Sequence, residues 1–418
     1  MSYLKYRMRY CSFILAAILP FLFSCSQVMT VTVTNPADLD RETEMVEISL
    51  DKVTSALGLE DGETFVVRSS GQAVPYQVTY DGKVIFPVKL KAGASESYKI
   101  TEGTPDQVTE QVRGDHYPRR VDDICWENDL IGFRVYGFKE DKPSGYDIFV
   151  KRNTELPAIP EMYRRAFDPQ LKKVHKQLKK ADKDSADRFN CDHISFHVDH
   201  GFGADCYGVG PTLGAGTNAL VDGETIVYPY CYDSFRILDN GPLRFTIELT
   251  FRPFKYGESE NVVETRVISL DLGSYFNRTI VQYANLDKPA PIVTGIVLQD
   301  KDGKAVGNAS EGYIAYPAPT INYDKQREVD NGTIYVGHVY PGQLDKAEIV
   351  YFSDEESKNR GNAKGHVLAY SNYDPKAPFI YYWGAGWNHS QMKSYEQWTA
   401  LLEKFSAQLR NPINIAVN

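Results

Sequence analysis

The sequence lacks the short motifs that mark the common nucleotide-binding and hydrolytic enzymes. Its 418 residues contain no Gly-x-Gly-x-x-Gly fingerprint, phosphate-binding loop, Gly-x-Ser-x-Gly elbow or His-Glu-x-x-His pair. Each of these motifs has a defined physical task, such as presenting backbone N–H groups to a phosphate or two imidazoles to a zinc ion. Their absence disfavours nucleotide-dependent enzymes and the common hydrolase families.

An excess of positive charge is also missing. The chain carries 46 Lys and Arg against 55 Asp and Glu, a formal net charge of -9. Because a nucleic-acid-binding surface needs basic groups to meet phosphates, we expect no nucleic-acid partner. The overall sign does not exclude an acidic sugar, since a local group of Arg and Lys side chains can bind one.

A hydrophobic run long enough to anchor the chain is lacking near the N-terminus. The apolar stretch at residues 11–23 follows three basic residues and is too short to span a bilayer permanently. It ends in Leu-Phe-Ser-Cys, which matches the lipobox of bacterial lipoproteins. We therefore expect residues 1–24 to be removed and Cys25 to carry lipid, so that the membrane is a partner through the anchor. The predicted location is lipid-anchored, at the periplasmic face or the cell surface.

Cysteine is scarce, with six in the chain. An exported protein permits disulfides, so Cys206 can pair with Cys191 or with Cys231. All of the cysteines that follow the lipobox can equally be buried free thiols. They are Cys125, Cys191, Cys206 and Cys231.

Aromatic residues make up 12% of the chain, which also has 28 Tyr and 31 Gly. This composition, with alternating apolar segments separated by turns, is typical of β-sheet proteins and of surfaces that handle sugars. We predict a mainly β fold: a small N-terminal β domain at residues 25–110 and a large antiparallel β-sandwich at 111–418. Helical spacing of apolar residues predicts a helical insertion near 157–190 and a C-terminal helix near 391–410.

Titratable groups are densest at residues 191–216. Alternation at 193–199 predicts a strand that places His197 and Asp199 on one face, ahead of a glycine-rich loop. The His-x-His-x-Asp pattern can present ligands to a metal, but its spacing matches no zinc signature, so we expect no metal and no other cofactor. The candidate catalytic and binding residues in this stretch are His197, Asp199, His200, Asp205 and Tyr207.

Two further regions carry groups suited to a sugar. At residues 117–137, arginines near a tryptophan can bind a carboxylate and stack a pyranose ring, or simply form surface ion pairs. At 381–388, two tryptophans on a glycine-rich turn can form an aromatic platform, or a core cluster. The candidates from these regions, and from strand-like runs that can face the same cleft, are Arg119, Trp126, Glu127, Arg134, Arg266, His338, Trp383 and Trp387.

Several of these segments together resemble an exported bacterial family called domain of unknown function 4861. They are NPADLDRETEMVEI, YPRRVDDICWENDLIGFRVYG, FHVDHGFGADCYGVGPTLGAG, LDNGPLRF, ETRVISLDLGS and YYWGAGW. More distantly, a β domain followed by a large sandwich is similar to the exo-rhamnogalacturonan lyases and to galactose-mutarotase-like supersandwich proteins. The resemblance implies acidic glycans of the pectin or ulvan type as substrates.

The expectation is therefore a carbohydrate-active enzyme for uronic-acid-containing oligosaccharides, most simply a lyase. For β-elimination we expect Arg119, Arg134 or Arg266 to neutralise the carboxylate. His197 or His200 would be the base, oriented by Asp199, and Tyr207 the acid. A hydrolase using Glu127 with Asp199 or Asp205 is the first alternative. A non-catalytic glycan-binding lipoprotein using Trp383 and Trp387, or a mutarotase-like epimerase, are the others.

Overall fold

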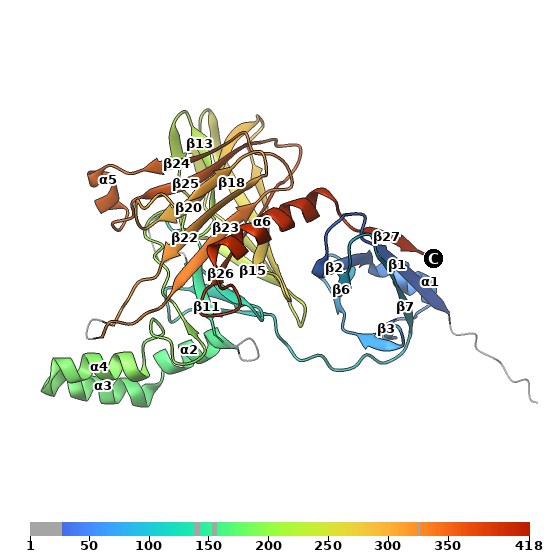
Figure 1. Cartoon of the computed structure of the whole chain (residues 1–418), viewed down its shortest axis with the longest axis horizontal. Helices are drawn as coiled ribbons and strands as arrows, with labels where there is room; N and C mark the ends of the chain where they lie inside the picture. The colour runs from blue at the N-terminus through green and yellow to red at the C-terminus, as the bar shows by residue number, and fades with distance from the viewer. Residues whose placement is uncertain (1–26, 138–142, 153–156, 325–326) are drawn as a thin grey trace, which may run out of the picture.

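The computed structural model describes residues 27–137, 143–152, 157–324 and 327–418 (Figure 1). The chain is mainly β, as predicted, and forms a small β domain beside a large β-sandwich. Cys25 lies outside the described residues, so its lipidation stays a prediction. In the described part of the chain, no helix combines the length and apolar character needed to cross a bilayer.

The small domain packs two antiparallel sheets around one apolar core that includes Val31, Phe86 and Ile100. A short helix, α1 (Leu50–Leu57), buries Val53 and Leu57 against this core and was not predicted. The five-stranded sheet has the order β27 (Asn414–Val417), β1 (Val28–Thr34), β7 (Ser95–Glu102), β3 (Phe65–Ser69) and β4 (Gln72–Val74). The three-stranded sheet has the order β2 (Arg41–Ser49), β6 (Lys83–Leu90) and β5 (Gln77–Val78).

A nine-stranded antiparallel sheet is the centre of the large domain. Its side chains alternate between an inner face packed in the main core and an outer face that is half exposed, as the two-residue period of a strand requires. The strand order is β15 (Ser234–Asn240), β16 (Arg244–Thr250), β18 (Ser259–Asp271), β19 (Phe276–Ala284), β26 (Phe379–Trp387), β23 (Thr333–Val339), β22 (Tyr313–Pro319) and β21 (Val306–Asn308), with β17 (Phe254–Tyr256) paired to β18.

Two five-stranded sheets cover the inner face of the nine-stranded sheet, and all three share one apolar core. The first has the order β12 (Gly203–Ala204), β11 (Asp147–Lys151), β10 (Ile131–Val135), β9 (Asp123–Glu127) and β8 (Arg113–Tyr117). The second has the order β14 (Thr225–Val227), β13 (Asn218–Asp222), β20 (Ala290–Leu298), β25 (Gly365–Tyr373) and β24 (Lys346–Tyr351). A short helix, α5 (Asp354–Asn359), precedes β25.

The predicted helical insertion is present as α2 (Ala158–Ala166), α3 (Pro169–Ala181) and α4 (Lys183–His193), of which α3 and α4 project from the sandwich (Figure 1). The prediction of a strand at 193–199 is wrong. Helix α4, capped at its N-terminus by the side chain of Asp182, ends at His193 and so takes only the first residue of that span. The segment that follows is a series of turns.

The predicted C-terminal helix, α6 (Tyr395–Arg410), packs Trp398 and Leu402 on the outer face of the nine-stranded sheet. Beyond it, β27 returns to the small domain and pairs antiparallel with β1. The last residues of the chain, which the sequence assigned to the large domain, therefore complete a sheet of the small one. Figure 1 shows α6 running from the sandwich to the small domain, so the two domains are joined twice by the chain.

Gln77 fastens the small domain to the sandwich by three hydrogen bonds to backbone. Its Oε1 accepts from the N–H groups of Leu243 (3.0 Å) and Arg244 (2.9 Å), and its Nε2 donates to the carbonyl of Arg244 (3.1 Å). Nearby, the N–H of Tyr80 donates to Asp239 at 2.7 Å. These four hydrogen bonds form a polar junction between the two domains.

Substitution Gln77→Ala should lower the free energy of unfolding by about 2–3 kcal/mol, because it leaves buried backbone groups of the partner domain without hydrogen-bond partners. Chemical denaturation measures the change. Gln72→Ala, at an exposed position of β4, is the matched control and should be neutral. Equal stability of the two variants would contradict the role assigned to Gln77.

Candidate functional site

A buried cluster of charges lies on the face of the β8–β12 sheet that points away from the main core. Arg134 is 2% exposed and donates to Asp147, to Asp205 (2.7 Å) and to the hydroxyl of Tyr136 (2.9 Å). Asp123 adds a third carboxylate at 3.6 Å from Arg134. The cross-strand register places Arg134 opposite Asp147, so the pleat itself brings these groups together.

His197 stands at the edge of this charge cluster. Its Nδ1 donates to the carbonyl of Asp205 at 2.8 Å, which leaves Nε2 as the nitrogen with the lone pair. The ring stacks on Tyr323, with centroids 4.2 Å apart, and the side chain is 28% exposed. The sequence-predicted residues Arg134, His197 and Asp205 are thus neighbours.

The guanidinium of Arg134 is nevertheless committed to protein carboxylates. A ligand carboxylate would have to displace Asp147 or Asp205 from a buried ion pair, and that costs several kcal/mol. The charge cluster is therefore a structural one that anchors the loop carrying His197. The expectation that Arg134 binds a sugar carboxylate is wrong for this reason.

Neighbouring candidates also serve the architecture. Both oxygens of Glu127 accept from the first N–H groups of α2, those of Ala158 (2.9 Å) and Ile159 (3.2 Å), and Lys151 completes an ion pair at 2.9 Å. Because α2 has no side-chain cap of its own, this carboxylate satisfies its N-terminus. Glu127 is 2% exposed, so the expectation that it contacts substrate is wrong.

Asp199 and His200 shape the turns after α4. Asp199 accepts from the N–H groups of Gly201 (2.7 Å) and Gly203 (3.0 Å) and pairs with Arg152 (2.6 Å). His200 bonds the carbonyl of Ser195 through Nε2 at 3.0 Å. Asp199 therefore orients backbone and an arginine in place of the predicted histidine.

A second group of candidates lies inside the sandwich. Trp383 and Trp126 are both 0% exposed. The indole of Trp383 donates to Thr279 at 2.8 Å, and that of Trp126 donates to Asn277 at 2.7 Å. Trp387 is 2% exposed and donates to the carbonyl of Asn331 at 2.7 Å. The predicted aromatic platform is wrong, because these indoles belong to strands whose inner face forms the core.

Three remaining candidates are buried as well. His338 is 0% exposed between Thr294 (3.0 Å) and the carbonyl of Ala215 (3.0 Å), and burial lowers its pKa to about 3. Tyr207 is 2% exposed, and its hydroxyl donates to the carbonyl of Gly214 at 3.3 Å. Arg266 is 1% exposed and is engaged within the sandwich. None of the three reaches the surface.

Arg119 alone among the predicted arginines is exposed, in the turn after β8. The cysteines Cys125, Cys191, Cys206 and Cys231 are buried free thiols, one of the two alternatives left open by the sequence. Over the described residues, no cluster of three or more His, Cys, Asp or Glu side chains is arranged to hold a metal ion.

A groove of about 570 Å³ lies where the small domain, α6 and the outer face of the nine-stranded sheet meet. Strand β2 forms one wall and α6 the other, while β18, β19 and β26 form the floor. In Figure 1 this is the region where α6 passes between the two domains. Junctions between domains are preferred places for ligand sites, and the sequence-predicted residues lie elsewhere.

The groove floor is a cross-strand row of polar side chains. Register pairs Ser269 with Arg278, and Arg278 with Tyr382. Arg278 also hydrogen-bonds the phenol of Tyr382, while burial raises the pKa of that phenol. Aromatic side chains flank the row on the α6 side, namely Tyr275, Phe276 and Phe405.

Two of the cations that line the groove are not paired with its carboxylates. Arg244 binds Asp271 with two hydrogen bonds (2.5 and 2.8 Å) and Glu47 with one (2.6 Å). Arg278 and Lys404 also line the groove, and neither forms an ion pair with any carboxylate of the described residues. Two cations are thus available to an anionic ligand.

The sequence contained a signal for this groove in the motifs already singled out. Ser269 and Asp271 lie in the ETRVISLDLGS segment, and Tyr382 lies in YYWGAGW. The residues predicted from these two segments, Arg266 and Trp383, have the opposite strand parity and point inward. Alternation along a strand shows which residues share a face, but it does not show which of the two faces is buried.

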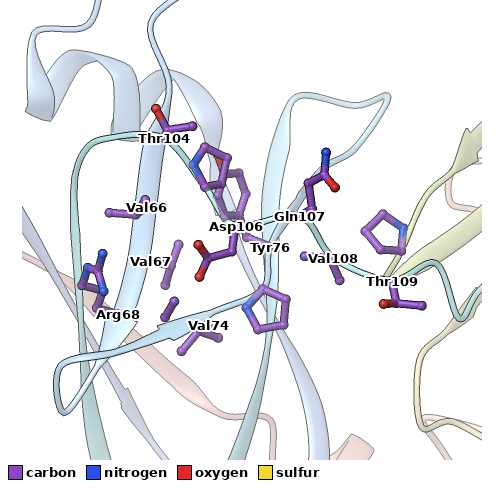
Figure 2. Close-up of a pocket in the computed structure, with 14 residues that line it drawn as sticks. Val66, Val67, Arg68, Val74, Tyr76, Thr104, Asp106, Gln107, Val108 and Thr109 are labelled. Carbon is purple, nitrogen blue, oxygen red and sulfur yellow. The ribbon is translucent and has the colours of Figure 1, made fainter.

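Figure 2 shows another hollow, of about 560 Å³, between β3, β4 and the linker at residues 104–109. Its walls are largely aliphatic, with Val66 and Val74 among them. Of the described residues that line it, only Arg68 and Asp106 are charged. This hollow offers few groups to a sugar, so the interdomain groove is the better candidate.

The charge cluster predicts a pH dependence of stability. Burial raises the pKa of Asp123 to about 6, with Arg134 partly opposing the shift. Between about pH 4 and pH 6 the unfolded chain releases this proton while the native state retains it, so stability falls as pH rises. Asp123→Asn should remove that loss, whereas Asp115→Asn, at an exposed position of β8, should leave it. Denaturation at several pH values measures both, and parallel profiles for wild type and Asp123→Asn would refute the assignment.

Comparison with known proteins places the chain in a family. A model described as "Domain of unknown function (DUF4861)" matches residues 33–415. "Uncharacterized protein P7" of Formosa agariphila is 25% identical over 414 residues, 94% of each chain. Two solved structures from Enterococcus faecalis, an alpha-mannosidase and a protein in glycosyl hydrolase family 38, match 94% of this chain with TM-scores of 0.48 and 0.49 at 9% and 8% identity. This chain spans about half of each, 46% and 47%. Because the family model matches most of its length, the chain belongs to the DUF4861 family.

Proposed function

We propose that the protein binds uronic-acid-containing oligosaccharides in the interdomain groove and cleaves them by β-elimination. The observation that carries this proposal is Arg278, a guanidinium on the groove floor with no carboxylate partner among the described residues. Arg278 can therefore bind a sugar carboxylate in the bidentate manner that guanidinium favours, without displacing a protein acid. Lys404 on the α6 wall adds a second positive charge for a longer acidic chain.

Arg278 would also supply the first requirement of the reaction. β-Elimination removes the proton on C5 of the uronate, next to its carboxylate, breaks the C4–O bond and forms a C4=C5 double bond. Neutralising the carboxylate stabilises the negative charge that develops as the C5–H bond breaks. A preorganised guanidinium on a rigid strand does this without reorganisation.

Tyr382 is placed to complete the proton transfers. Its oxygen accepts a hydrogen bond from Arg278, and burial raises its pKa, so the phenol keeps its own proton. That proton is available to the leaving oxygen at C4. Asp271 lies on the same face of β18, two residues from the partner of Arg278. Both of its oxygens accept from Arg244, but each keeps a second lone pair, so we assign Asp271 to accept the C5 proton.

An exported, lipid-anchored protein suits this substrate. Lipid on Cys25 would hold the domains at a membrane surface, where acidic oligosaccharides from outside the cell arrive. Mass spectrometry of the membrane fraction would detect the acyl groups on Cys25.

Substitution Arg278→Gln should reduce cleavage of oligogalacturonates or ulvan fragments about 10²–10³-fold, since it removes one preorganised charge from the transition state. The assay is ultraviolet absorbance of the unsaturated uronide. Arg236→Gln is the matched control, because Arg236 lies on the outer face of the same sheet, paired with Glu248, outside the groove. Full activity of Arg278→Gln, or no unsaturated product from the wild-type protein with any acidic glycan, would contradict the proposal.

A hydrolase is the second candidate, favoured by two carboxylates on the small-domain wall. Burial raises the pKa of Glu44, with Arg41 partly offsetting it. For Glu47, burial acts in the same direction, but Arg244 and Lys83 outweigh it and lower the pKa. Carboxylates with pKa values moved apart are what a glycosidase needs for its proton donor and its base or nucleophile.

Substitution Glu44→Gln distinguishes the two chemistries. In a hydrolase it should lower the release of reducing ends about 10²–10⁴-fold, because the proton donor is lost. In a lyase it should leave formation of unsaturated product within a few-fold. Glu42→Gln, a neighbouring groove carboxylate that is exposed and paired with Lys89, is the control. Reducing ends without ultraviolet absorbance, lost in Glu44→Gln alone, would establish the hydrolase.

A further inference from the structure

A separate pocket of about 130 Å³ opens at one end of the sandwich, on the inner side of the nine-stranded sheet. The loop after β14 and the turn between β16 and β17 form its sides. Tyr230 stands at the mouth and is 44% exposed, and Phe254 lines the opposite side. This volume equals that of about four water molecules at roughly 30 Å³ each, so one edge of a sugar ring can enter it and a chain cannot.

Two buried polar side chains form the base of the pocket. Glu264 and Tyr283 are 3% and 6% exposed. The amide of Asn218 donates to both, to Oε1 of Glu264 at 2.7 Å and to the hydroxyl of Tyr283 at 3.0 Å. Arg266 donates to the same Oε1 at 2.5 Å. Polar groups this deep in an apolar core are costly unless they are paired or serve a ligand.

This arrangement leaves one acceptor and one donor for a ligand. Both donors converge on Oε1 of Glu264, so its Oε2 retains lone pairs. The oxygen of Tyr283 already accepts from Asn218, and burial keeps its pKa well above the usual value, so its proton stays in place to donate. A hydroxyl group, which both donates and accepts, matches this pair.

The base is electrically balanced. Arg266 is held over the ring of Phe251, 4.2 Å from its centroid, and donates to the hydroxyl of Tyr146 at 2.9 Å. Its charge compensates that of Glu264. Arg252 also lines the pocket, at an exposed position, and lies over the ring of Tyr230, 4.5 Å from its centroid. At the base itself a ligand carboxylate would meet Glu264, so the base favours the hydroxyl groups of a neutral polyol.

We propose that this pocket binds one neutral hexose unit, with its hydroxyls on Glu264 and Tyr283 and its ring against Tyr230 and Phe254. Aromatic faces suit the C–H faces of a pyranose, and the two polar groups fix its orientation. The pocket lies on the opposite side of β18 from the interdomain groove, so this site does not depend on the proposed activity of the groove.

Calorimetric titration of the full chain with D-galactose, D-glucose and D-galacturonate tests the assignment. A neutral hexose should bind with a dissociation constant on the order of 1 mM. Tyr283→Phe, which deletes the donor, should weaken binding about tenfold. Tyr230→Ala should weaken it as well, and because Tyr230 is exposed this variant keeps the fold, which thermal unfolding verifies. Arg278→Gln should leave hexose binding unchanged.

Three results would overturn the proposal. They are the absence of saturable binding of either neutral hexose to the wild-type chain, binding that persists unchanged in both tyrosine variants, and binding lost in Arg278→Gln, which would place the sugar in the groove. Galacturonate that binds as tightly as the neutral hexoses and is equally sensitive to Tyr283→Phe would also exclude a neutral ligand class.

Discussion

The ion pairs of Arg244 are the contact on which the candidate site depends. This residue lies at the start of β16. It donates two hydrogen bonds to Asp271 on the neighbouring strand and one to Glu47 of the small domain. Its side chain is only 12% exposed, so solvent screens these contacts weakly. Together with Gln77 and the return of the chain through α6, Arg244 sets the width of the groove. It also pairs with two groove carboxylates, which leaves Arg278 without an acidic partner among the described residues.

A single property of strands explains how one sheet can carry two unlike sites. Side chains of β18 alternate between faces, so Glu264 points into the sandwich while Ser269 and Asp271 point to the groove. The inner face is largely apolar, and the charge of Glu264 on it is matched by Arg266. The outer face is half exposed and tolerates an unmatched guanidinium such as Arg278. The two proposed ligands, one acidic and one neutral, would therefore lie on opposite faces of the sheet.

Periodicity in the sequence predicted the β domain, the sandwich, the helical insertion and α6, because each depends on local patterns of apolar residues. It did not predict that β27 pairs with β1, since nothing in four residues near the C-terminus identifies a partner almost 400 positions away. The strand expected at His197 is absent because the alternation there is short, and the residues after α4 form turns. The sequence singled out the tryptophans near the C-terminus. A tryptophan that packs in the core and one that binds a ligand cannot be told apart from the sequence alone.

Two predicted arginines and one that the sequence did not single out show what makes an arginine available to a ligand. Arg134, Arg266 and Arg278 are alike in sequence, each in an alternating strand beside polar neighbours. In the fold, Arg134 meets three carboxylates and Arg266 meets one, so burial and pairing have already used their charge. Arg278 lies on the half-exposed outer face of the sheet. The groove acids Glu47 and Asp271 are paired with Arg244, and Glu47 also with Lys83. An arginine becomes available to a ligand when the acids around it are paired with other cations. Which cations and acids meet depends on how whole strands are arranged, and a local sequence pattern does not show that arrangement.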